Sequence, residues 1–263
     1  MDRRSFVHNV GSAAVLSVFA STASRTQSTG STPLGKIMAV AAHPGDGLFT
    51  MGAVLAQQIE RGGAGVLLSL SLGEKGAPKN MPVQQYGEMQ REATQKATRL
   101  LGADAIFLEY PDAEIPFNEQ SSLRVCDLIR EQKPNIVVTH WSGSWHKDHQ
   151  NCHLIVQDAV FYAGLETLER KLPPHAASKV FYADNWEDAT NFIPDTYVNI
   201  EAVYEKWLQA CDFYPMWRGQ TGFFCYNDYY SSLAVMRGCL SGVKRAVALM
   251  CDPNQRTQRL QSL

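Results

Sequence analysis

The sequence predicts an α/β domain built around a mostly parallel β-sheet. Short apolar runs alternate with segments whose apolar residues recur at helical spacing, and polar or glycine-rich loops separate them. The chain has 263 residues, of which 45% are hydrophobic and 19% charged, an ordinary balance for a protein with a substantial core. Strands that alternate with helices imply right-handed crossovers, and ligands then bind at the carboxyl ends of the strands.

The individual elements follow from local patterns. The first strand is expected at residues 36–42 (KIMAVAA), before a Gly/Pro loop, and the first helix at residues 48–60, before the stop signal Arg61-Gly62-Gly63. Residues 135–140 (NIVVTH) have the composition of a strand that is covered on both faces. Further strands are expected at 65–72, 105–109, 179–183 and 196–200, and further helices at 86–101, 121–131, 151–172 and 203–211.

Residues 1–33 differ in character and are assigned to an export signal and a polar linker. Arg3-Arg4 precedes an apolar stretch at residues 11–20, and small residues near Ala23 fit a cleavage site. This layout is typical of a twin-arginine signal, although a chance Arg-Arg pair before an apolar anchor would look the same. We expect an exported protein, periplasmic or extracellular, with a single domain at residues 34–263. Because a membrane span needs about 20 apolar residues, none is expected in the mature protein.

Charge and cysteine spacing exclude other classes of protein. The formal net charge is -2 and Lys and Arg form no long run, so nucleic acid is not an expected partner. The six cysteines lie far apart without a Cys-x-x-Cys pair, which argues against a zinc knuckle or a redox pair. Buried free thiols are expected, and a disulfide among the last four cysteines stays open.

Four of the seven histidines lie in two segments that each follow a predicted strand. The first reads AHPGDG at residues 42–47, and the second reads HWSGSWHKDH at residues 140–149. His43 and Asp46 on a tight turn, together with His149 from a neighbouring strand end, can bind one cation and leave a position for water. This two-nitrogen, one-oxygen set is typical of a hydrolytic zinc site.

Two other interpretations of the same residues stay open. His43 and Asp46 could cap the following helix, with the second segment a polar surface turn. Alternatively, His149 and His153 could ligate a metal as a pair at i and i+4, although this would leave the first loop without a role.

These motifs resemble the PIG-L (LmbE-like) family of metal-dependent de-N-acetylases, whose first loop reads Ala-His-Pro-Asp-Asp-Glu and whose second contains His-Pro-Asp-His. The resemblance implies a Rossmann-like three-layer fold and one zinc ion per chain, or another divalent metal, held by His43, Asp46 and His149. The similarity extends along most of the mature chain, through Gly73-Glu74-Lys75-Gly76, Arg91-Glu92, Leu101-Gly102 and Tyr110-Pro111-Asp112.

The resemblance also implies that His146 polarises or protonates the scissile amide and that Asp148 orients its imidazole. Gly45, however, stands where the family has its general base, and Gly47 where it has a glutamate. A general base contributes about 10²–10⁴-fold, whereas zinc-bound water already ionises near pH 7, so slow hydrolysis can survive its loss. The residues that could supply a base from another strand end are Asp112, Glu114 and Glu74.

Arg91 and Glu74 are the predicted substrate-binding residues. Arg91 could anchor a hydroxyl or a phosphate, or it could form an ordinary helix-surface pair with Glu88 or Glu92.

The sequence therefore predicts a metal-dependent hydrolase that removes an N-acyl group, with acetyl expected, from an amino sugar or glycoconjugate. The substrate class follows from the resemblance alone. One alternative is a catalytically silent relative that binds metal and carbohydrate but has lost its base, and another is a purely structural metal site. The sequence does not predict an oligomeric state.

Overall fold

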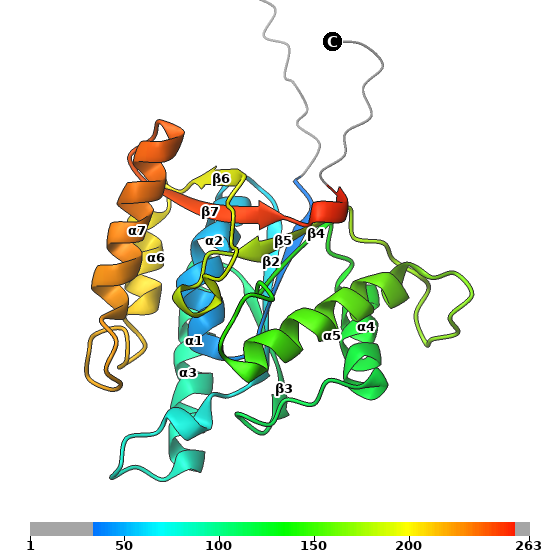
Figure 1. The fold of residues 1–263 in the computed structure, drawn as a ribbon, viewed down its shortest axis with the longest axis horizontal. Helices are drawn as coiled ribbons and strands as arrows, with labels where there is room; N and C mark the ends of the chain where they lie inside the picture. Colours follow the sequence, from blue (N-terminus) through cyan, green and yellow to red (C-terminus); the bar gives the residue numbers. More distant parts are fainter. Residues whose placement is uncertain (1–33, 256–263) are drawn as a thin grey trace, which may run out of the picture. The chain divides into compact units, whose positions relative to one another are not determined.

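The computed structural model describes residues 34–255, which contain seven β-strands. The strands span Lys36–Ala41 (β1), Ala64–Ser71 (β2), Asp104–Tyr110 (β3), Ile136–Thr139 (β4), Lys179–Ala183 (β5), Thr196–Asn199 (β6) and Ala246–Cys251 (β7). They form one sheet in the order β3-β2-β1-β4-β5-β7-β6 (Figure 1). β1 to β5 pair in parallel, whereas β7 runs antiparallel to β5 and β6. The predicted mostly parallel sheet is confirmed.

Helices cover both faces of the sheet, which gives the predicted three layers (Figure 1). The α-helices span Pro44–Asp46 (α1), Gly52–Glu60 (α2), Val83–Leu101 (α3), Glu119–Gln132 (α4), Lys147–Gly164 (α5), Tyr204–Cys211 (α6) and Tyr226–Ser241 (α7). A π-helical turn spans Gly47–Met51 (η1), and 3₁₀ turns span Glu74–Gly76 (η2), Trp186–Asp188 (η3) and Pro253–Gln255 (η4). α4 and α5 pack together on one face, and α2, α3, α6 and α7 lie on the other.

β1 illustrates why a continuous apolar run forms a central strand. Met38 and Val40 enter the core beneath α4 and α5, whereas Ala39 and Ala41 enter the core beneath α2. Successive side chains point to opposite faces of a sheet, so a strand covered on both faces needs apolar residues at every position. The register is fixed by pairing Met38 with Val66 of β2 and with Val137 of β4.

The largest differences from the predicted elements are the bounds of one helix, one further helix and one further strand. α5 begins at Lys147, four residues earlier than expected, because the His146 ring caps it, Nδ1 accepting the Asp148 N–H at 3.2 Å. It ends at Gly164, where the buried Arg130 side chain donates to the carbonyl groups of Tyr162 and Leu165. α7 was not predicted, because it buries Tyr230, Ala234 and Gly238 and has no Leu or Val stripe. β7 was also missed, although its AVALMC sequence carries the usual signal of a buried strand.

Cys126, Cys152 and Cys211 are buried free thiols, and Cys225 and Cys239 are exposed free thiols. Among residues 34–255, no helix is long and apolar enough to cross a membrane. The export signal predicted for residues 1–33 lies outside the described residues.

Candidate metal centre

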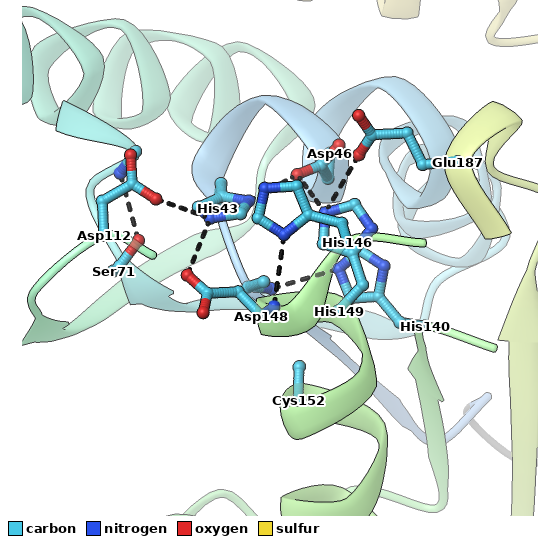
Figure 2. A network of polar contacts seen from close by, with 12 residues as sticks. His43, Asp46, Ser71, Asp112, His140, His146, Asp148, His149, Cys152 and Glu187 are labelled. Carbon is cyan, nitrogen blue, oxygen red and sulfur yellow. Dashed lines mark hydrogen bonds and ion pairs between the residues drawn. The ribbon is translucent and has the colours of Figure 1, made fainter. Parts of the chain in front are cut away.

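The candidate site lies where the strand order changes direction. From β1 the chain builds β2 and β3 on one side, and it then returns to place β4 and β5 on the other. In such sheets a crevice forms between the two central strands at their carboxyl ends. His43 follows the end of β1, and His149 lies in the first turn of α5, just after β4 (Figure 2). Asp46 and His149 are therefore in helical turns, where loops were predicted.

Three side-chain atoms from these two segments converge. His43 Nδ1 lies 2.9 Å from Asp46 Oδ2, and His149 Nε2 lies 3.1 Å from the same oxygen. The three residues form one of the His and carboxylate groups whose ligand atoms all lie within 4.8 Å of one another. The structure thus brings together the three predicted metal ligands.

A buried carboxylate fixes the orientation of His149. Asp188 Oδ1 accepts a hydrogen bond from His149 Nδ1 at 2.8 Å, and its Oδ2 accepts one from His140 Nδ1 at the same distance. The other nitrogen of His140, Nε2, accepts the Ala42 N–H at 3.1 Å, so His140 carries its proton on Nδ1. All three polar side chains are fully buried. This arrangement leaves Nε2 of His149 as the nitrogen that faces Asp46, as a metal ligand requires.

The donor set fits a cation. With the His149 proton on Nδ1, an unprotonated Nε2 would face the Asp46 carboxylate, and two acceptors cannot satisfy each other without a positive charge between them. In the metal-free protein a proton supplies this charge. Burial alone would lower the pKa of His149, but Asp46 and Asp188 outweigh it and raise the pKa to about 9. Burial would likewise raise the pKa of Asp46, whereas His149 and His43 hold it well below its ordinary value.

The second nitrogen of His43 faces two further carboxylates. Nε2 lies 3.0 Å from Asp112 Oδ1 and 3.4 Å from Asp148 Oδ2. Burial would lower the pKa of His43, but Asp112, Asp148 and Asp46 raise it well above the ordinary value. These contacts hold the ring so that Nδ1 points toward Asp46, which is the usual role of carboxylates around a metal-binding histidine.

His146 lies beside this group and lines the cavity. Its ring is stacked on His149, with centroids 4.6 Å apart. The contact that orients it differs from the expectation, because the backbone N–H of Asp148 donates to His146 Nδ1, whereas the Asp148 carboxylate accepts the Ala113 N–H at 2.7 Å. Burial and the nearby positive charges of His149 and His43 lower the pKa of His146 to about 4. A neutral ring with Nδ1 as an acceptor carries its proton on Nε2.

The cavity has a volume of about 320 Å³ and two kinds of wall. One wall is polar, and the other is apolar and aromatic. Gly45 lies under the apolar wall, where an added Cβ would be 3.3 Å from Met216 Sδ and 3.4 Å from the Phe49 ring. The polar side chains include His43, Asp46, Asp112, His146 and Glu187, and the apolar ones Phe49, Tyr86, Met216 and Tyr226.

The predicted substrate-binding residues lie outside the cavity lining. Arg91 forms ion pairs with Glu88 at 3.1 Å and with Glu109 at 2.9 Å, so it is the helix-surface residue of the alternative interpretation. Glu74 accepts the Asp112 N–H at 2.8 Å and so positions the loop after β3.

Two other sequence candidates are also placed elsewhere. Glu114, considered as a base, is paired with Lys75 on the surface. His153 binds the His140 carbonyl at 3.0 Å and does not pair with His149.

Three residues of the site were not predicted: His140, Glu187 and Asp188. Glu187 and Asp188 lie in η3, directly after β5. Polar residues at the carboxyl end of a parallel strand are the signal that identified the other ligands, and the same rule applied to residues 184–188 would have found them.

Comparison with known proteins supports the resemblance to the PIG-L family that the sequence motifs indicate. The model of the PIG-L family, described as GlcNAc-PI de-N-acetylase, matches residues 38–160. The chain is 25% identical over 224 residues to 4-oxalmesaconate hydratase of Pseudomonas putida, covering 81% of this chain and 84% of that protein. It is 24% identical over 231 residues to diacetylchitobiose deacetylase of Thermococcus kodakarensis, covering 83% of each.

Two solved structures share the fold. The 4-carboxy-2-hydroxymuconate hydratase of Pseudomonas putida KT2440 has a TM-score of 0.78 at 22% identity, covering 86% of this chain and 99% of that chain. The N,N'-diacetylchitobiose deacetylase of Pyrococcus horikoshii has a TM-score of 0.71 at 19% identity, covering 83% and 84%. The PIG-L family model thus matches residues 38–160 of this chain, and the proteins similar to the chain include deacetylases and a hydratase.

Proposed function

We propose that this protein is a metal-dependent hydrolase, with one zinc ion per chain, that removes an N-acyl group from an amino sugar or glycoconjugate. Acetyl is the expected acyl group. The observation that carries the proposal is the convergence of His43 Nδ1, Asp46 Oδ2 and His149 Nε2 beside His146 in one cavity. When bound by these three residues, zinc polarises a carbonyl group and lowers the pKa of water toward 7.

His146 is assigned to the oxygen of the scissile amide. Its Nδ1 accepts the Asp148 N–H, so Nε2–H is its remaining donor. A donor held in place before the reaction stabilises the negative charge that develops on a carbonyl oxygen without reorganisation. In the overall reaction, water adds to the carbonyl carbon, the C–N bond breaks, and the amine leaves with a proton. The products are a carboxylate and a free amino group.

The shape of the cavity supports an amide of a sugar as the substrate class. The polar wall offers hydrogen-bond partners for hydroxyl groups, and the apolar wall of Phe49, Tyr86, Met216 and Tyr226 suits a sugar face and an acyl methyl group. The names of two relatives, a diacetylchitobiose deacetylase and a deacetylase of an inositol-linked acetamido sugar, support the same class.

A second candidate is a hydratase, which adds water to a substrate without releasing an acyl group. Gly45 favours it, since no carboxylate occupies the position of the family's base, and so does the similarity to 4-oxalmesaconate hydratase. The charge of the cavity favours the hydrolase. A substrate with several carboxylates would meet Asp46, Asp112 and Glu187, and the lining Lys75 is already paired with Glu114.

The test is metal content of the purified protein beside His149→Ala, followed by assays on the same samples. About one metal per chain, lost in the variant, together with acetate release from N-acetylglucosamine or diacetylchitobiose, is the expected result. Water addition to a 4-oxalmesaconate-type acid without acetate release would favour the hydratase. Metal binding without either reaction would favour a catalytically silent relative, and a wild-type protein without metal would overturn the proposal.

Export by the twin-arginine route is part of the proposal, supported by Arg3-Arg4 and the apolar stretch that follows. A fusion of residues 1–33 to a reporter should reach the periplasm, and Arg3→Lys with Arg4→Lys should retain the reporter in the cytoplasm.

A further inference from the structure

The Glu187 carboxylate faces the candidate metal centre. It comes from η3, an element that contributes none of the three metal ligands. It lies in η3, where the Asn185 side chain accepts the Glu187 N–H at 3.0 Å and fixes the turn. Its Oε2 lies 3.4 Å from His149 Nε2, the same nitrogen that Asp46 approaches at 3.1 Å (Figure 2). Two carboxylates from different strand ends therefore converge on one ligand nitrogen.

The Glu187 side chain is 12% exposed and lines the cavity. Among the contacts of residues 34–255, His149 is the one group within ion-pair or hydrogen-bond distance of its carboxylate. Asp112 and Asp148 differ in this respect, since they accept backbone N–H groups of Lys75 and Ala113. Burying a carboxylate without a donor is costly unless a positive charge lies beside it.

His149 alone does not provide enough positive charge for both carboxylates. The Nδ1–H of His149 is donated to Asp188. Nε2 can therefore offer at most one proton, which Asp46 and Glu187 would have to share. Lys75, which also lines the cavity, is held by Glu114. His43, the other ring in contact with Asp46, also faces Asp112 and Asp148, so carboxylates are in excess over positive charges where the metal ligands converge.

A divalent cation removes this excess. Two neutral imidazoles and Asp46 leave one positive charge on a divalent ion, and Glu187 balances it. We propose that Glu187 is a fourth member of the metal site, whose carboxylate neutralises the bound ion and increases the affinity of the site for it. The inference rests on the proposed metal-dependent function, and it concerns the strength of metal binding, not the reaction that follows.

The test is the zinc affinity of purified protein, measured by competition with a chromophoric chelator at one fixed pH. Glu187→Gln keeps the shape of the side chain and removes its charge, and it should weaken zinc binding by about 10–100-fold, the effect usual for groups around metal ligands. Glu187→Asp, which keeps the charge on a shorter side chain, should retain part of the affinity. Glu60→Gln removes an exposed carboxylate at the end of α2, away from the cavity, and should bind zinc as the wild type does. Circular dichroism and metal-free melting temperatures check that each variant folds.

Unchanged affinity in Glu187→Gln would overturn the inference, and so would an equal loss in Glu60→Gln, which would reveal a general effect of net charge. The proposed function fails separately: a wild-type protein that binds no zinc would sink both, whereas one that binds zinc but releases no acetate would sink the hydrolase and leave the Glu187 comparison valid.

Discussion

At the scale of single residues, the chemistry depends on how each imidazole is protonated. His146 has its pKa lowered to about 4 by burial and by His149 and His43, so it is neutral at pH 7 and acts as a hydrogen-bond donor. We expect His146→Ala to reduce kcat for acetate release by about 10²–10³-fold, since one donor to the developing oxyanion has this value. Metal content should stay near one per chain, because His146 is outside the ligand set. A loss of metal in this variant would instead identify His146 as a ligand.

Gly45 raises a different question, namely whether the missing carboxylate can be restored. An added side chain would approach Met216 Sδ and the Phe49 ring, so a carboxylate at this position would enter apolar surroundings. We expect Gly45→Asp alone to destabilise the protein by about 1–3 kcal/mol without increasing acetate release. Combining it with Met216→Ala opens space, and any gain in activity is expected only in this double variant. The check is urea unfolding together with kcat, and a gain of tenfold or more in the single variant would contradict this interpretation.

At the scale of elements, Arg130 shows how α4 holds the end of α5. The Arg130 side chain is 1% exposed and donates to the carbonyl groups of Tyr162, Leu165, Leu168 and Leu172, at the end of α5 and in the segment that follows it. We expect Arg130→Met to lower the free energy of unfolding by about 2–4 kcal/mol, because several buried carbonyl groups lose a charged donor. The exposed Arg99→Met is the matched control and should have little effect on unfolding by urea. Zinc content should not change, and a loss of zinc would mean that the end of α5 affects the site.

How far the sequence predicts the structure also depends on the element. β1, β4 and the two motif segments were predictable, because apolar runs and His or Asp residues at strand ends are local signals. The start of α5 was not, since its cap is the ring of His146, and His is not a typical capping residue. α7 was not predicted because its buried face consists of Tyr230, Ala234 and Gly238. These residues do not form the apolar stripe that identifies a buried helix in a sequence. The role of Asp188 requires tertiary contacts with His140 and His149 that no local pattern encodes.

At the scale of the whole molecule, charged and titratable side chains gather at one edge of the sheet, at the carboxyl ends of the parallel strands. Segments after β1, β3, β4 and β5 contribute His43, Asp112, His149 and Asp188, each from a different strand end. Groups with raised pKa values contact groups with lowered ones, so protons and a bound metal ion would compete for the same atoms. We therefore expect both the stability of this domain and the proposed metal binding to depend on pH.

This linkage gives a prediction with a definite sign. The folded-state pKa of His149 is about 9, above the ordinary 6.5 of an unfolded chain, so its protonation stabilises the metal-free protein fully below pH 6.5. That contribution, at most about 3 kcal/mol, is lost as the pH rises through 9. The melting temperature of metal-free protein should therefore fall between pH 6.5 and 9, more steeply than that of His149→Gln.

Zinc affinity should change in the opposite direction over the same interval. Zinc bound at His149 Nε2 would displace its proton, so each pH unit below about 9 should cost up to tenfold in apparent affinity, and affinity should rise from pH 7 to pH 9. Calorimetry with and without zinc should show a stabilisation that grows with pH. A zinc stabilisation that is constant from pH 6.5 to 9 would mean that the proton and the ion do not share this nitrogen, and His149 would then have to be removed from the ligand set.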